Sequence, residues 1–229
     1  MRFLSSSVFA VAAALVASST VENHVIGPFA LRITGKQDSA IDGYAWACHA
    51  GAAIEGLCYV AGSSAVEGDV YEFYYNYTLH DGIVYPGAIS YEFLFGGGED
   101  DQAQAASLPS FLRLYPNWAS NVHIALLPPS TAEGTIFSLD FDTGFFYMGD
   151  IVDDTHFYNA TPPAPPGQPG TGTHSNISNF HICYQWTGGY WLRSLAWVAG
   201  LEGYPPQNPS CEPVNLGVES LGPEKIDFF

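Results

Sequence analysis

The stretch NFHICYQWTGGYWLRSLAWV, residues 179–198, decides the fold class of this chain. Two apolar segments flank Gly188-Gly189, and a Gly-Gly loop favours a β-hairpin because both central residues can take positive φ. The loop predicts a register in which Tyr184 faces Arg193. Because side chains alternate along a strand, one face of the hairpin then carries Phe180, Ile182, Tyr184, Trp186, Trp191, Arg193, Leu195 and Trp197.

An aromatic face with one arginine allows two interpretations. In the first, the face belongs to the hydrophobic core, and Arg193 stacks on the rings at the edge of the sheet. In the second, the face is the wall of a pocket for a flat molecule with polar edges, and Arg193 binds an enolate or carbonyl oxygen of that molecule. The sequence leaves both interpretations open.

The N-terminus, MRFLSSSVFAVAAALVASST, predicts a secretory signal peptide. Arg2 precedes an apolar run from Val8 to Val16, and small residues follow it. The run is too short to span a membrane, and no later stretch is long and apolar enough to do so. We therefore expect a signal peptide over residues 1–19 and a protein that is secreted or stays in the lumen of the secretory pathway.

The remaining residues, 20–229, have the length of a single domain. The whole chain carries 23 acidic and 6 basic residues, a formal net charge of −17. Nucleic acid and anionic membrane surfaces are therefore not expected as partners, because phosphate binding requires clustered Lys and Arg. Aromatic residues make up 15% of the chain, which calls for either a large core or a ligand site.

Short strand-like runs separated by Gly, Pro, Asn and Asp follow one another with almost no helical periodicity. We expect an all-β fold, an antiparallel sandwich or barrel with disulfides and an aromatic interior, and a Pro/Gly-rich surface loop at 161–173. In the two most aromatic strands, residues 70–78 and 88–95, alternation predicts that Tyr71, Phe73, Tyr75, Tyr77, Ile89, Tyr91, Phe93 and Phe95 point inward.

Four cysteines suit two disulfides in an oxidising compartment. Three pairings are possible, and we favour Cys48 with Cys58 and Cys183 with Cys211 because each of these closes a local loop.

Asn76, Asn159 and Asn176 each begin an Asn-X-Ser/Thr sequon, whereas Asn208 is excluded by the proline that follows it. Three sequons behind a signal peptide predict N-glycosylation in a eukaryotic secretory pathway.

Familiar catalytic motifs are absent from the sequence: it has no GxSxG, HExxH, Walker or GxGxxG motif. The histidines are scattered and no CxxC occurs, so we expect neither a metal nor another cofactor. A glycosidase needs two carboxylates on inner faces. The alternation leaves only Glu55 and Asp150 as candidates for such a pair.

Three blocks carry a resemblance: CHAGAAIEGLC at 48–58, the hairpin at 179–198 and PQNPSCEPV at 206–214. Together with the signal peptide, four cysteines and several sequons, they resemble fungal secreted proteins and the hetero-Diels–Alderases of tropolone–sesquiterpenoid pathways, which are glycosylated, disulfide-bonded β proteins. The resemblance covers nearly the whole mature chain and matches no catalytic motif. It implies a cofactor-free enzyme that forms a tropolone quinone methide and orients it against a humulene-type sesquiterpene.

A cycloaddition needs apolar partners held in one orientation, hydrogen-bond donors for the developing charge, and the exclusion of water. Since the aromatic walls, tyrosine hydroxyls and Arg193 can meet these needs, we follow the resemblance and predict a cofactor-independent pericyclic enzyme of fungal secondary metabolism that acts on small apolar substrates. The predicted catalytic residues are Arg193 and Tyr184, and the predicted substrate-binding residues are Tyr75, Phe73, Trp186, Trp191 and Trp197.

The alternative is a non-catalytic secreted β-sandwich protein of the fungal wall that binds glycans or lipids. A third possibility is a structural glycoprotein whose aromatic residues fill a dry core. Exposed tryptophans in a shallow row favour glycan binding, whereas a deep enclosed aromatic cavity favours the enzyme.

Overall fold

The computed structural model describes residues 20–62, 71–95, 106–130, 134–153 and 173–221. The predicted signal peptide at 1–19, the sequon at Asn159 and residues 161–172 of the predicted Pro/Gly-rich loop lie outside the described residues.

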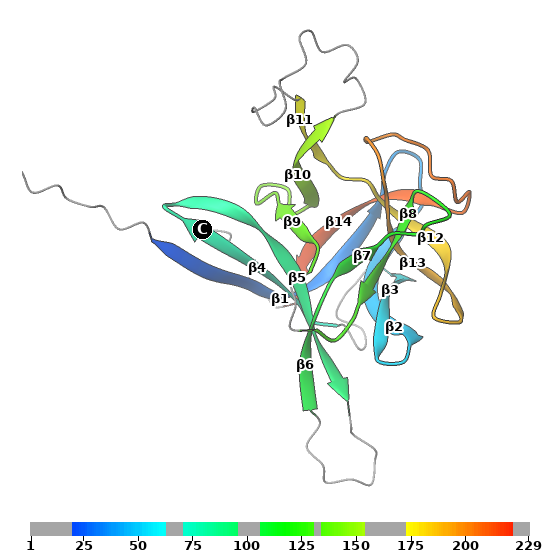
Figure 1. The fold of residues 1–229 in the computed structure, drawn as a ribbon, viewed down its shortest axis with the longest axis horizontal. Coiled ribbons are helices and arrows are strands. Elements are labelled where there is room, and N and C mark those ends of the chain that lie inside the picture. Colours follow the sequence, from blue (N-terminus) through cyan, green and yellow to red (C-terminus); the bar gives the residue numbers. More distant parts are fainter. Residues whose placement is uncertain (1–19, 63–70, 96–105, 131–133, 154–172, 222–229) are drawn as a thin grey trace, which may run out of the picture.

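Strands make up the secondary structure of the described residues, which contain no helix, so the predicted all-β class is confirmed (Figure 1). The strands are β1 (Val21–Gly35), β2 (Asp42–Gly51), β3 (Ile54–Ala61), β4 (Phe73–His80), β5 (Ile83–Phe95), β6 (Ala106–Phe111), β7 (Arg113–Tyr115), β8 (Val122–Leu127), β9 (Ile136–Leu139), β10 (Phe146–Asp153), β11 (Thr173–Ile177), β12 (Phe180–Thr187), β13 (Tyr190–Val198) and β14 (Glu212–Ser220).

The long strand β1 connects the two ends of the molecule. Its first half, up to Ile26, pairs with β4, and its second half, from Phe29, pairs with β14 and β2, all antiparallel. Phe29, Leu31 and Ile33 alternate toward the interior and are completely buried. This alternation is what a strand with one face on the core requires.

Six strands return to their starting point and form a barrel-like ring: β1–β14–β12–β13–β3–β2–β1. The pair Ser194–Cys58 joins β13 to β3 in this ring. On the other side of β1, the sheet continues through β4, β5, β9, β10 and β11. Figure 1 shows the first half of β1 projecting with β4 and β5 as an arm, away from β12 and β13.

The β12–β13 hairpin has the register predicted from its sequence, including Tyr184 opposite Arg193. Gly188 and Gly189 have φ of 55° and 106°, as a two-residue loop of this type requires. Gly188 also lies against β2, where a Cβ atom would come 1.8 Å from the carbonyl oxygen of Ala50. A larger residue at Gly188 would therefore push the two hairpins apart.

Both favoured disulfides are formed. Cys48–Cys58 joins β2 to β3, and Cys183–Cys211 joins β12 to the segment before β14. The predicted aromatic interior is also present. Its largest fully buried side chains are Tyr75, Phe29, Phe73, Phe137, Phe146, Phe180, Leu31, Ile33, Leu57, Ile89, Leu112 and Leu127.

Candidate functional site

The aromatic face of the β12–β13 hairpin divides into two halves. At the open end of the hairpin, Phe180 and Trp197 are buried, and their rings meet edge to face at 5.1 Å. Near the turn, Trp186 is 60% and Trp191 69% exposed, and Tyr184 is 54% exposed. The inner half thus belongs to the core, and the outer half is an aromatic surface in contact with solvent.

An open cleft of about 520 Å³ lies beside this outer half. Its rim combines the outer half with Tyr115 and Trp118, which lie around the β7–β8 connection, and with Gln207 and Asn208, which precede β14. Three of the five tryptophans of the chain border the cleft. Trp118 is 97% exposed. Large apolar rings that are this exposed to solvent lower the solubility of a protein. Their concentration at one cleft therefore indicates a binding surface.

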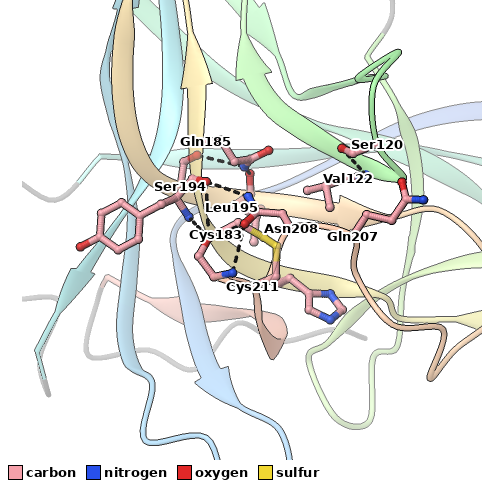
Figure 2. Close-up of a disulfide and its surroundings, with 12 residues drawn as sticks. Ser120, Val122, Cys183, Gln185, Ser194, Leu195, Gln207, Asn208 and Cys211 are labelled. Atoms are coloured by element: carbon pink, nitrogen blue, oxygen red, sulfur yellow. Dashed lines mark hydrogen bonds between the residues drawn. A yellow bond between two sulfur atoms is a disulfide. The ribbon is translucent and has the colours of Figure 1, made fainter.

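The wall formed by residues 204–210 is fixed at several points (Figure 2). The Cys183–Cys211 disulfide ties its C-terminal end to β12. Asn208 Nδ2 donates to the carbonyl oxygen of Tyr184 at 2.8 Å, and the Tyr184 N–H donates to Ser210 Oγ at 2.9 Å. These side chains bond the backbone groups of Tyr184 on the edge of β12 that faces away from β13, beyond the short pairing of β12 with β14.

The same wall is joined to the opposite one by two reciprocal hydrogen bonds. Asn121 N–H donates to Gln207 Oε1 at 2.9 Å, and Gln207 N–H donates to Asn121 Oδ1 at 2.8 Å. In the β7–β8 connection, Asn117 Oδ1 accepts from Ala119 N–H at 2.9 Å. Both walls are therefore held in place before any ligand binds.

The cleft is uncharged: its rim and floor contain no Asp, Glu, Lys, Arg or His among the described residues. Its polar groups are amides and hydroxyls, which come from Asn117, Gln185, Gln207, Asn208, Ser120, Tyr115 and Tyr184. Gln185 is buried in the floor, where its Nε2 donates to Ser194 Oγ at 3.2 Å. Such a surface can bind by stacking and neutral hydrogen bonds, but its lining lacks the carboxylate pair that sugar hydrolysis requires.

Arg193 lies at the boundary between the two halves. Its guanidinium group stands 4.8 Å from the ring centre of Tyr59 and 6.0 Å from that of Tyr184. Its Nη2 also lies 3.3 Å from a carboxylate oxygen of Glu212. The arginine does not line the cleft. These contacts correspond to the first interpretation of the sequence, in which Arg193 stacks on rings at the sheet edge.

The predicted site residues fall into two groups. The structure brings Tyr184, Trp186 and Trp191 together at the cleft. Phe73 and Tyr75 are completely buried in the core, and Trp197 is 6% exposed and packs there too. The Tyr75 hydroxyl donates to the Phe137 carbonyl at 2.9 Å, and burial raises the pKa of Tyr75 to about 12. These three residues do not border the cleft.

Sequence reasoning missed Trp118, Tyr115, Gln207 and Asn208. The one available signal was the segment Pro116-Asn117-Trp118, in which a tryptophan follows two turn-forming residues. A bulky apolar residue in a turn has no core strand to bury it, so such a position points to the surface.

The two carboxylates considered for a glycosidase lie apart from the cleft. Glu55 lies opposite His49 in the β2–β3 pair, and desolvation raises its pKa, while the charge of His49 partly opposes this shift. Asp150 is exposed on β10, and one of its oxygens lies 2.5 Å from His174 Nδ1.

A second open cleft, of about 620 Å³, is polar and lies near β10 and β11. The Lys36 ammonium at its rim contacts Glu202 at 3.0 Å and the carbonyl of Ser178. Asp140 has a lowered pKa because the Thr143 side chain and then the Asp142 and Thr143 N–H groups donate to its carboxylate. Since these charged groups already have partners inside the chain, we propose no ligand for this cleft.

No group of three or more His, Cys, Asp or Glu side chains among the described residues is placed to hold a metal ion. Nor do these residues include a helix whose length and hydropathy would let it cross a bilayer. Comparisons with protein-family models, curated proteins and solved structures found no match for this chain.

Proposed function

We propose that this protein is a non-catalytic glycan-binding protein whose cleft holds a neutral sugar chain against Trp118, Trp186 and Trp191. The observation that carries the proposal is the concentration of three solvent-exposed tryptophans at one pre-formed cleft. The two disulfides are compatible with an oxidising environment, and secretion to the fungal wall is part of the proposal.

The chemistry of the cleft suits sugars. The C–H groups on one face of a pyranose carry slight positive charge, and the faces of aromatic rings carry slight negative charge. Stacking therefore favours sugar rings, while the amides of Asn117 and Gln207 can bond the hydroxyl groups at the ring edges. The uncharged lining and the net charge of −17 favour a neutral glycan over an acidic one.

Calorimetric titration of the purified glycoprotein with soluble fragments of neutral glucans, chitin and mannan tests the proposal. We expect saturable binding of at least one of these glycans. Trp191→Ala should weaken that binding by about 2 kcal/mol, roughly 30-fold, because exposed tryptophans at the centre of binding sites carry large contributions. The free energy of unfolding should change by less than about 0.5 kcal/mol, because the side chain is on the surface.

Tyr85→Ala is the matched control, since Tyr85 is an exposed aromatic residue outside the cleft. This variant should bind like the wild type. If none of the glycans binds, or if both variants bind as the wild type does, the proposed function is wrong.

The hetero-Diels–Alder reaction remains a second candidate function. In its favour, Tyr184, Trp186 and Trp191 share one surface, and Arg193 stands beside Tyr184. Against it, side chains more than half exposed exclude little of the water that would hydrolyse a quinone methide. Incubation with a chemically generated tropolone quinone methide and humulene, followed by chiral chromatography, tests this function. A faster reaction that gives one stereoisomer would favour the enzyme over the binding protein.

A further inference from the structure

The outer face of the β1–β4–β5 arm carries a row of directly opposed residues across four strands. Ile136 on β9 lies opposite Ala88 on β5, Ala88 lies opposite Asn76 on β4, and Asn76 lies opposite Val25 on β1. Directly opposed residues of antiparallel strands point to the same side of a sheet. Asn76 therefore stands between the apolar side chains of its neighbouring strands.

This face carries several exposed apolar side chains, and the polar residues Asn23, Thr78 and His80 lie among them. The alternate residues Phe73, Tyr75 and Tyr77 of β4 point to the core, so the face that holds Asn76 points to solvent. Its exposed apolar side chains, with their exposed fractions, are Val21 (64%), Val25 (62%), Ile83 (62%), Ile136 (46%) and Tyr85 (45%). We call this set of five residues together with Asn76 the arm face. An apolar area of this kind indicates that something covers it.

Asn76 begins the sequon Asn76-Tyr77-Thr78, and Thr78 lies on the same face two residues later. The Asn76 side-chain nitrogen donates to Ser90 Oγ at 2.7 Å and makes a longer contact of 3.4 Å with the carbonyl oxygen of Ala88. An amide nitrogen has two hydrogens. A sugar at this nitrogen can therefore replace the longer contact while the shorter bond to Ser90 stays.

We propose that an N-linked glycan on Asn76 lies across the arm face and covers it. In the secretory lumen, the amide nitrogen would lose one hydrogen and bond to the anomeric carbon of an N-acetylhexosamine. The donor is a lipid-linked oligosaccharide, whose diphosphate carrier leaves with the proton. The central place of the sequon within the apolar area decides the occupant, because a glycan attached there would keep a second protein surface from docking.

Asn176 offers a comparison within the same chain. It is exposed on β11, the terminal strand of the sheet order, and it borders the polar second cleft. A glycan on Asn176 would cover little apolar surface. Loss of that glycan should thus change solubility far less than loss of a glycan on Asn76.

Thr78 provides the most discriminating variants. Thr78→Val keeps the Asn76 amide and its bond to Ser90 but destroys the sequon, whereas Thr78→Ser keeps the sequon. Both proteins would be secreted from a eukaryotic host and studied by intact mass, size-exclusion chromatography and fluorescence of the apolar dye ANS. We expect Thr78→Val to lose one glycan, to bind several-fold more dye and to self-associate. The Thr78→Ser and Asn176→Gln variants should stay monomeric.

If Thr78→Val does not fold, enzymatic removal of N-glycans from the folded wild-type protein is the alternative test. This treatment should raise dye binding in the wild type and not in a Val25→Thr, Ile136→Thr variant, in which the arm face is more polar. Two results would overturn the proposal: an unmodified Asn76 in the secreted wild type, or loss of its glycan without any rise in dye binding or self-association. Neither result bears on glycan binding at the tryptophan cleft, which is measured separately.

Discussion

The inner and outer halves of the β12–β13 hairpin have the same register, the same sheet face and similar aromatic side chains, yet they end in opposite environments. Phe180 and Trp197 pack against the rings and aliphatic chains of the core. The ring centres of Trp186 and Trp191 lie 5.6 Å apart, edge to face, and both side chains are mostly exposed. The difference shows that alternation assigns a side chain to a face, while burial depends on which strands lie across from that face.

The largest expected effect belongs to the inner half. Phe180→Ala should destabilise the fold by about 3–5 kcal/mol, because it removes a completely buried ring and leaves a cavity among well-packed neighbours. Chemical denaturation with both disulfides intact measures this change. The fraction of the variant that folds should bind glycan with the same affinity as the wild type.

The matched variant in the outer half is Trp186→Ala, which should change the free energy of unfolding by less than about 0.5 kcal/mol. If the two variants lose similar stability, the division of the hairpin into a core half and a binding half is wrong.

Much of the fold followed from local chemistry. The Gly-Gly loop fixes the hairpin register, and alternation places Phe29, Leu31 and Ile33 in the core, because turn geometry and strand pleating act within a few residues. The order of the strands did not follow. The pairing of β1 with β4, β14 and β2 depends on contacts far apart in the sequence, which no local pattern encodes.

The candidate site was only partly predictable for the same reason. Tyr184, Trp186 and Trp191 lie together at the cleft, as their shared position on one face of the hairpin predicts. Phe73 and Tyr75 were assigned to a pocket because alternation points them inward. In the structure the interior at these positions is a packed core, in which both side chains are completely buried. Trp118 was missed because its position at the cleft depends on the bonds between Asn121 and Gln207, two segments distant in sequence.

A smaller effect is expected at the boundary between the halves. Arg193→Met keeps an apolar stem but removes the contact with Glu212 and the stacking on Tyr59. We expect a loss of about 1 kcal/mol of stability, because this ion pair is partly exposed and the cation–π contact is of modest strength. Thermal and chemical unfolding measure this loss.

Arg193→Lys refines the result, since lysine keeps the charge but cannot stack as a planar group. Glycan affinity should be unchanged in both variants because Arg193 does not line the cleft. Loss of ligand binding in Arg193→Met at normal stability would instead assign the arginine to the site, as the pericyclic hypothesis requires.

The smallest effect concerns pH and again separates inner from outer positions. His181 lies near the open end of the hairpin, on the face opposite to the aromatic one, and is buried. Desolvation lowers its pKa below 6.5. The nearby charge of Lys36 lowers this pKa further, whereas the hydrogen bond to the Asn179 carbonyl raises it. Below pH 6.5 the unfolded chain therefore binds a proton at this histidine, while the folded chain stays unprotonated there until the lowered pKa is reached. The free energy of unfolding thus decreases as the pH falls from 6.5 toward the lowered pKa, and this contribution is complete above pH 6.5. His123 on β8 has a pKa lowered by burial and adds to the same trend.

His181→Asn can keep a hydrogen bond to the Asn179 carbonyl and cannot titrate. We expect it to flatten the stability curve below pH 6.5, measured by denaturation at several pH values. If His181→Asn shows the same dependence of stability on pH as the wild type, burial of His181 is not the cause of that dependence.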